Sequence, residues 1–197
     1  MPFGRLIVAI LIFVATILVP LLAQASDPDA LRKIVEGHCV PSESAASNPA
    51  PCRLVDLTGH YAVLKDLLGT TQYLVIPTDT ITGIEAHGLL ALDAPNYWED
   101  AWEARRFMEE GAGRPVPRNV VGLAINSQRG RSQNQLHIHI DCVRADVIQA
   151  LTKNEASIGS VWRSFPGSSG RSVRSLAKSP ARRALWRWVP TLAERVT

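Results

Sequence analysis

The stretch that decides the fold is Ser132-Gln133-Asn134-Gln135-Leu136-His137-Ile138-His139-Ile140-Asp141-Cys142. Successive side chains of a β-strand point to opposite faces of the sheet, so this stretch predicts a strand with two different faces. The polar face carries Gln135, His137, His139 and Asp141, and the apolar face carries Leu136, Ile138, Ile140 and Cys142. The pattern predicts a candidate active site on one face and core packing on the other, where Cys142 is expected as a small buried residue.

Composition indicates a folded protein of ordinary domain size. The chain has 197 residues, of which 46% are hydrophobic and 20% are charged, and these values exclude a disordered chain. Its net charge of +3 is unevenly distributed, because residues 163–197 contain eight Lys or Arg residues and one acidic residue, Glu194. A basic tail on a slightly acidic body favours contact with an anionic surface, and membrane lipid, nucleic acid and plain solvated charge all remain open from charge alone.

The amino terminus predicts a membrane segment. Leu6 to Ala23 is an uncharged run of 18 residues preceded by Arg5, and about 17 to 25 apolar residues suffice for a transmembrane helix. Ala23-Gln24-Ala25 also fits a small-x-small cleavage site, so residues 1–25 are either a retained anchor or a cleaved signal. Both alternatives place the rest of the chain on the outer side of the membrane.

The three cysteines fit an oxidising compartment. Cys39 and Cys52 bracket a polar segment, Pro41 to Pro51, which is expected to be a loop that a disulfide closes. We therefore predict a Cys39–Cys52 disulfide. Three free thiols, or a pairing that involves Cys142, are the alternatives.

The remaining pattern predicts an α+β fold. The expected helices are Asp27 to Gly37, Asn96 to Gly111 and Asp146 to Ser160, and the expected strands are Tyr61 to Asp66, Gln72 to Pro77, Val120 to Asn126 and the histidine stretch. Hairpin connections favour an antiparallel sheet covered by helices on one face.

Several motifs together carry a family resemblance. They are Gln72 to Pro77, Ala124 to Ser127, Gly130 to Asn134, Leu136 to Cys142, Lys33 to Val35, Cys39 to Pro41, Pro49 to Cys52 and Tyr61 to Asp66. In order and spacing they resemble the histidine-triad superfamily of nucleotide hydrolases and transferases, and within it the bacterial CDP-diacylglycerol diphosphatase family. The resemblance implies a histidine-triad-like antiparallel sheet with flanking helices, preceded by one N-terminal transmembrane helix.

The resemblance also implies an activity and a location. Members hydrolyse the diphosphate bond of CDP-diacylglycerol to CMP and phosphatidate, which implies a liponucleotide substrate, contact with membrane lipid, no cofactor and no nucleic acid. Residues 27–167 are expected to form the catalytic domain, on the periplasmic side of a bacterial inner membrane. The chain departs from the pattern at Gln135, where a histidine is often found, and in residues 168–197, a basic tail that is divergent or truncated relative to the family.

Roles for individual residues follow from phosphoryl chemistry and from the resemblance. A neutral imidazole is a good nucleophile toward phosphorus, and His137 is expected to form a covalent nucleotidyl intermediate. His139 and Gln135 are expected to hydrogen-bond to phosphate oxygens, and Ser132 is expected to donate to the bridging or leaving oxygen. The expected substrate-binding residues are Asn126, Arg131, Lys65 and Asp66.

Two alternatives compete with this interpretation. His137, His139 and Asp141, at alternate positions of one strand, could supply three ligands to Zn²⁺ for a metal-dependent phosphohydrolase. The second alternative is an inactive, membrane-tethered module that binds a nucleotide or lipid. The sequence gives no indication of the oligomeric state.

Overall fold

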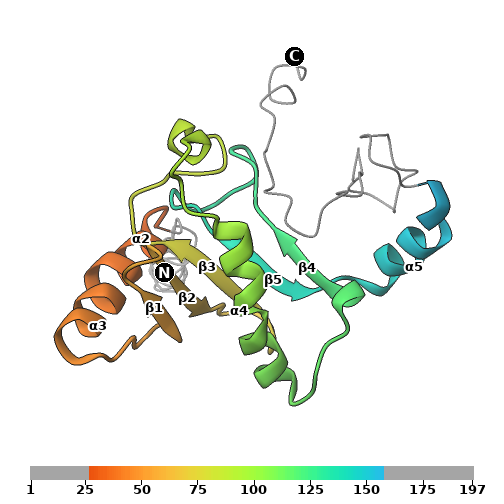
Figure 1. Cartoon of the computed structure of the whole chain (residues 1–197), viewed down its shortest axis with the longest axis horizontal. Helices are drawn as coiled ribbons and strands as arrows, with labels where there is room; N and C mark the ends of the chain where they lie inside the picture. Colours follow the sequence, from red (N-terminus) through yellow and green to blue (C-terminus); the bar gives the residue numbers. More distant parts are fainter. Residues whose placement is uncertain (1–26, 158–197) are drawn as a thin grey trace, which may run out of the picture.

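The computed structural model describes residues 27–157, which form an antiparallel sheet with flanking helices (Figure 1). The sheet has five strands in the order β1-β2-β3-β5-β4. The strands are Leu54–Asp56 (β1), Tyr61–Lys65 (β2), Tyr73–Pro77 (β3), Val121–Ala124 (β4) and Ile138–Cys142 (β5). All neighbouring strands pair antiparallel, so the predicted α+β class and antiparallel sheet are confirmed.

Short helices surround the sheet. The α-helices are Ala30–Ile34 (α2), Val40–Ala46 (α3), Tyr97–Ala112 (α4) and Ala145–Lys153 (α5); a π-helical turn, Val35–Cys39 (η2), and the 3₁₀ turns His87–Leu90 (η3), Arg118–Val120 (η4) and Glu155–Ser157 (η5) complete the set. The predicted helix from Asn96 is confirmed, because the Asn96 side chain accepts a hydrogen bond from the backbone N–H of Glu99. The helix ends at Gly113, whose φ of 66° is in the left-handed region that favours glycine.

Helix α4 covers one face of the sheet (Figure 1). Its residues Ala101 and Met108 are fully buried against Val75, Ile138 and Ile140 of β3 and β5. Burial of each large apolar side chain contributes about 1.5 to 3 kcal/mol. This packing fixes β5 against α4 and directs the alternate residues of β5 to the opposite face.

The continuous helical segment α2-η2-α3 covers part of that opposite face, so helices lie on both faces of the sheet and the expectation of a cover on one face only is wrong. Val35 and Cys39 are buried against Ala62, Leu74 and Ile76 of β2 and β3. A disulfide joins Cys39 to Cys52, with the two Cα atoms 5.6 Å apart. The disulfide ties this helical cover to the segment that enters β1, a strand that the sequence pattern did not predict.

Two expectations for this region are wrong. The first helix does not end at Gly37, which lies inside the π-helical turn with no atom within 4 Å of a side-chain position. The segment Pro41 to Pro51 is not a loop throughout, because its first six residues, Pro41 to Ala46, belong to α3. The helix ends only at Ser47, with φ 49°.

The histidine strand is shorter than predicted. β5 begins at Ile138 rather than at Ser132, so residues 132–137 approach the sheet as a loop. Cys142 is exposed and unpaired, not buried as expected. It is the last residue of β5, opposite Val121, and the buried residues that β5 gives to the core are Ile138 and Ile140.

Some predictions concern residues outside the described range. The membrane segment of residues 1–25, the end of the expected domain at residue 167 and the basic tail of residues 168–197 all lie there. Within residues 27–157, no helix combines the length and apolar character needed to cross a membrane.

Candidate active site

The polar residues of the candidate site share one face of the sheet because of strand register. His139 of β5 lies directly opposite Leu74 of β3 and Ala124 of β4. Since alternate residues of a strand share a face, Gln72 and Asn126 fall on the His139 side, two residues from these partners. The sheet thus brings together residues from three separate segments of the chain.

His137 is buried, with 6% of its surface exposed. Its Nδ1 atom lies 2.7 Å from the backbone carbonyl oxygen of Gln135. A carbonyl only accepts hydrogen bonds, so Nδ1 carries the proton and donates it. The lone pair of His137 is therefore on Nε2, which is the atom that a nucleophilic imidazole uses.

Two amide side chains contact the ring of His139. Nε2 of Gln72 lies 2.9 Å from Nδ1, and Nδ2 of Asn126 lies 3.3 Å from Nε2. A neutral imidazole has one donor and one acceptor, whereas both amide nitrogens only donate, so one of the two amides takes its other orientation. Each ring nitrogen of His139 is thereby held by one amide side chain.

The charge state of His139 is set mainly by burial. Burial lowers its pKa, the nearby His137 lowers the pKa further, and Asp66 and Asp141 raise it by less. His139 is therefore neutral at pH 7. Its Nδ1 atom lies 3.8 Å from Oδ2 of Asp66, a distance at which a neutral ring makes neither an ion pair nor a hydrogen bond. The rings of His139 and His137 meet edge to face, with centroids 4.9 Å apart.

Asp141 is occupied by contacts within the sheet. Its Oδ1 atom accepts hydrogen bonds from Oγ1 of Thr71 at 2.9 Å and from the backbone N–H of Cys142 at 2.7 Å. In the part of the chain that the structure describes, no group of three His, Cys, Asp or Glu side chains is arranged to hold a metal ion. The arrangement therefore does not support the three-ligand site that His137, His139 and Asp141 suggested.

Gln135 does not point toward the histidines as predicted. Its Nε2 group donates to the backbone carbonyls of Pro77 and Asp79, at 2.9 and 2.8 Å. Both N–H bonds of the amide are used, so the side chain has no donor left for a phosphate oxygen. The strand pattern failed here because β5 has not yet begun at residue 135. Gln135 acts through its backbone carbonyl, which orients His137.

Arg131 also has a structural partner. Its guanidinium Nη1 forms an ion pair with Glu85 Oε1, and 9% of its side chain is exposed. An added side chain at Gly83 would collide with this guanidinium, so the loop after β3 closes tightly over Arg131. Arg131 therefore holds this loop in place rather than presenting a free cation to phosphate.

Lys65, Asp66 and Ser132 occupy different parts of the site region. Lys65 donates to the backbone carbonyls of Asp66 and Gly69, at 2.8 and 2.9 Å, so its ammonium group stabilises the β2–β3 turn. Asp66 lies beside His139, as the substrate-binding prediction requires. Ser132 is exposed in the loop that leads to the histidines, and its predicted donation to a leaving oxygen stays a prediction.

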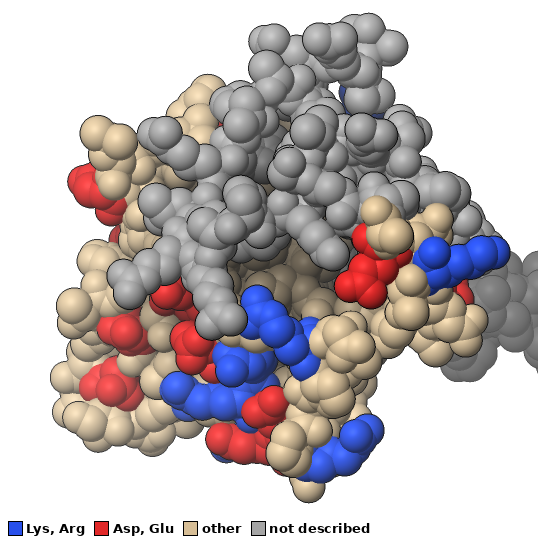
Figure 2. Space-filling view, turned by 45° about the vertical axis from the view of Figure 1, so that its right-hand side comes forward, with Lys and Arg blue, Asp and Glu red and all other residues tan. Residues whose placement is uncertain are grey.

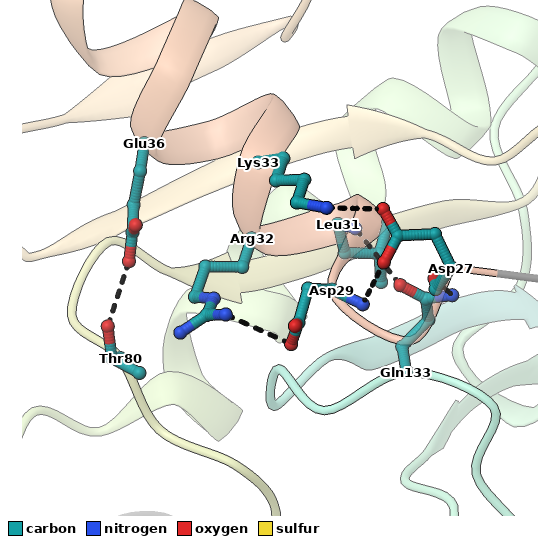
Figure 3. Close-up of polar contacts among 8 residues, drawn as sticks. All are labelled: Asp27, Asp29, Leu31, Arg32, Lys33, Glu36, Thr80 and Gln133. Carbon is teal, nitrogen blue, oxygen red and sulfur yellow. Dashed lines mark hydrogen bonds and ion pairs between the residues drawn. The ribbon is translucent and has the colours of Figure 1, made fainter.

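The loop that precedes the histidines is tied to the start of α2, as Figure 3 shows for Gln133. Gln133 accepts a hydrogen bond from the backbone N–H of Leu31 at 3.0 Å and donates to the carbonyl of Asp27 at 2.8 Å. A second link joins Glu36 of η2 to the hydroxyl of Thr80 at 2.8 Å. These contacts hold the loops on both sides of His137 against one helix.

Sequence reasoning missed Gln72 and Thr71 as site residues. Gln72 lies within one of the quoted motifs, but it was treated as the start of a packing strand. The alternation of β3 was a usable signal, because Gln72 shares the face of Leu74 and Ile76. Its contact with His139 required the pairing of β3 with β5, which local sequence does not reveal.

Comparisons with known proteins agree with the motif pattern. A CDP-diacylglycerol pyrophosphatase from Yersinia pestis is 46% identical over 142 residues, which cover 72% of this chain and 55% of that protein. The chain thus spans about half the length of this curated relative. Two solved structures also match, each at 18% identity with a TM-score of 0.38. A Hit-like protein covers 59% of this chain and 99% of its own length, and a HIT family hydrolase from Clostridium thermocellum covers 55% and 92%.

A family model described as CDP-diacylglycerol pyrophosphatase matches residues 26–177. This range includes the disulfide, the five strands and both site histidines. The chain therefore belongs to the CDP-diacylglycerol pyrophosphatase family.

Proposed function

We propose that this protein hydrolyses the diphosphate bond of CDP-diacylglycerol to CMP and phosphatidate through a nucleotidyl intermediate on His137. Family membership supports the substrate and the reaction class. The observation that carries the mechanism is the hydrogen bond from Nδ1 of His137 to the carbonyl of Gln135, which leaves the lone pair on Nε2. This arrangement suits a nucleophile better than a proton donor.

The first step transfers the cytidylyl group. Nε2 of His137 attacks the phosphorus attached to cytidine, an N–P bond forms, and the bond to the bridging oxygen breaks. Phosphatidate leaves with the bonding electron pair. The imidazole then carries positive charge, which the hydrogen bond from Nδ1–H to the Gln135 carbonyl stabilises. The neutral His139 donates its ring N–H to a phosphate oxygen as negative charge develops there.

The second step returns the enzyme to its starting state. A water molecule attacks the same phosphorus, the N–P bond breaks, and CMP is released. The lone pair returns to Nε2 of His137, and the water proton leaves with product or solvent. Because the histidine is regenerated, the cycle needs no cofactor or redox partner.

The proposal includes a location on the outer side of a bacterial inner membrane. The apolar run in residues 1–25 supports a membrane segment, and the Cys39–Cys52 disulfide supports an oxidising compartment. A liponucleotide keeps its acyl chains in the bilayer, so this location also gives the site access to the substrate.

The test is incubation of the full chain with CDP-diacylglycerol, with and without a chelator, followed by mass analysis of the products and the protein. We expect CMP and phosphatidate, turnover that persists with chelator, and a protein adduct with the mass of a cytidylyl group after rapid acid quench. Loss of turnover on chelation would favour the metal-dependent alternative. Binding without turnover would favour the inactive module.

A further inference from the structure

The turn between β2 and β3 exposes two large apolar side chains beside the site. Leu67 is 100% exposed and Leu68 is 74% exposed. Exposed single leucines are common on protein surfaces, but an adjacent pair at the tip of a turn is a different feature. The pair directly follows Asp66, whose Oδ2 atom lies 3.8 Å from Nδ1 of His139. The two leucines are therefore next to the candidate active site.

We propose that Leu67 and Leu68 enter the surface of a lipid bilayer and seat the active site on the membrane. This inference rests on the proposed function, because a substrate with acyl chains requires the site to work at that surface. It adds a contact, independent of any N-terminal anchor, that orients the catalytic face toward the lipid.

The turn is held in one conformation by its own polar groups. Asp66 Oδ1 accepts from the backbone N–H of Leu68 at 3.0 Å, and the Lys65 ammonium donates to the carbonyls of Asp66 and Gly69. Gly69 has φ 67°, in the left-handed region that glycine adopts without strain. A rigid turn presents both leucines without an ordering cost, and its satisfied backbone groups lower the penalty of leaving water.

Charge favours lipid over a charged protein partner. The segment from Leu67 to Gln72 contains no ionisable side chain. The two flanking charges point elsewhere, since Lys65 caps the turn carbonyls and Asp66 faces the turn and His139. Among the described residues on the face shown in Figure 2, the basic side chains lie beside acidic ones. The apolar turn is the better membrane contact.

The path from the turn to the catalytic ring is short and continuous. Thr71 bonds to Asp141, and Gln72 bonds to Nδ1 of His139 at 2.9 Å. Only two residues separate Leu68 from Thr71. A bilayer that contacts the two leucines therefore lies beside the site histidines. There the diacylglycerol portion of the substrate would extend from the reacting diphosphate into the lipid.

Leu92 provides a matched control. It is 97% exposed, but it lies before the start of α4. The β2–β3 turn is at the other end of this helix, because the carbonyl of Thr70 lies 3.1 Å from a side-chain position at Gly111. A helix of 16 residues is about 24 Å long, so Leu92 and the turn test opposite ends of the domain.

The experiment places a polarity-sensitive nitrobenzoxadiazole label at Leu67→Cys or Leu92→Cys in the full chain. Both variants carry Cys142→Ser, because Cys142 is an exposed free thiol. Single chains are assembled in phosphatidylcholine nanodiscs with or without brominated acyl chains. We expect bromine quenching at position 67 and none at position 92. Equal emission at the two positions would overturn the proposal, as would a shielded label at position 67 that bromine does not quench, which indicates contact with protein.

Activity gives a second, separable readout. Leu67→Ser with Leu68→Ser should lower turnover of bilayer-embedded CDP-diacylglycerol by about 10- to 100-fold, because two leucines lose their apolar transfer free energy. Turnover of a water-soluble CDP-alcohol and the melting temperature should not change, and Leu92→Ser should change none of these values. Equal loss on both substrates would overturn the docking role. If the unsubstituted chain turns over neither substrate, the proposed function fails, while the quenching result still decides membrane contact.

Discussion

Two halves of the same sheet face have opposite characters. On β2 and β3, the face carries Ala62, Leu74 and Ile76, sealed by the α2-η2-α3 segment and its disulfide. On β5, the same face carries His139 and Asp141, half-buried and bonded to amide and hydroxyl groups. Leu74 and His139 are directly paired, so the change occurs between adjacent strands. The site lies where the helical cover ends.

The comparison shows how one sheet supports packing and chemistry at once. A buried imidazole without partners would be costly, and hydrogen bonds at Nδ1 of His137 and at both ring nitrogens of His139 offset this cost. The sealed half and the α4 side supply the stability on which this polar half depends. Substitutions in the two halves should therefore affect different quantities.

The largest expected effect is on the polar half. Under the proposed mechanism, His137→Ala should lower the turnover of CDP-diacylglycerol by about 10⁴- to 10⁶-fold, because it removes the proposed nucleophile. The Gln135 carbonyl left without a donor should cost about 1 to 3 kcal/mol of stability, which is far too little to account for the loss of turnover in the folded protein. Turnover and urea denaturation of the same preparation separate the two quantities. Full activity in this variant would rule out the covalent mechanism.

His139→Ala should have the next largest effect. Loss of one donor to the developing phosphate charge should slow turnover by about 10²- to 10³-fold, and the cytidylyl adduct on His137 should still form. Rapid quench and mass analysis of the protein would detect it. A variant that turns over normally would show that His139 does not contact the transition state.

The sealed half should respond through stability instead. Ile76→Ala removes a fully buried side chain and should lower the free energy of unfolding by about 3 kcal/mol. Catalysis per folded molecule should change little, because Ile76 lies under α2-η2-α3. Urea denaturation measures the loss, and the exposed Leu92→Ala is the control. A large fall in turnover with unchanged stability would contradict the division into two halves.

The smallest expected effect concerns α4, on the other face. Burial, and then Asp56 and Glu99, raise the pKa of Asp100 to about 6 from 3.8. The folded state therefore binds more protons than the unfolded state between these values, and stability falls as the pH rises through this window. Asp100→Asn should stabilise the protein above about pH 6, by about 1 kcal/mol once partial exposure is allowed for. Urea denaturation near pH 4 and pH 8 tests this, and equal stabilisation at both would contradict it.

Local patterns predicted most of the elements. The two β-rich runs at Tyr61–Asp66 and Gln72–Pro77, joined by a short connection with Gly69, predicted an adjacent antiparallel pair, and the cap at Asn96 predicted the start of α4. The family also followed from motif order. The ends of elements were less predictable, since Gly37 and Pro41 are usual helix breakers yet lie within α2-η2-α3. Whether such residues end a helix depends on what the helix packs against.

The candidate site was only partly predictable, because its contacts also depend on how distant segments pack together. The sequence predicted four catalytic residues, His137, His139, Gln135 and Ser132, and four substrate-binding residues, Asn126, Arg131, Lys65 and Asp66. The structure brings Asn126 and Asp66 to His139. The sequence also suggested that Gln135 binds phosphate, whereas the side chain holds the loop at Pro77 and Asp79. The sequence does not show which acceptor a side-chain donor will bind, and the two acceptors of Gln135 lie more than fifty residues away along the chain.

The sequence by itself determined the α+β class, the family and a strand that has His139 on one face and the buried Ile138 and Ile140 on the other. These properties depend on residue type and short spacing, which are local. Only the tertiary structure decided that Gln72 contacts the ring of His139, that Arg131 pairs with Glu85, and that Leu67 and Leu68 lie beside the site. Those assignments depend on which strands pair and where the helical cover ends, and both are set by contacts between distant segments that form only when the core packs.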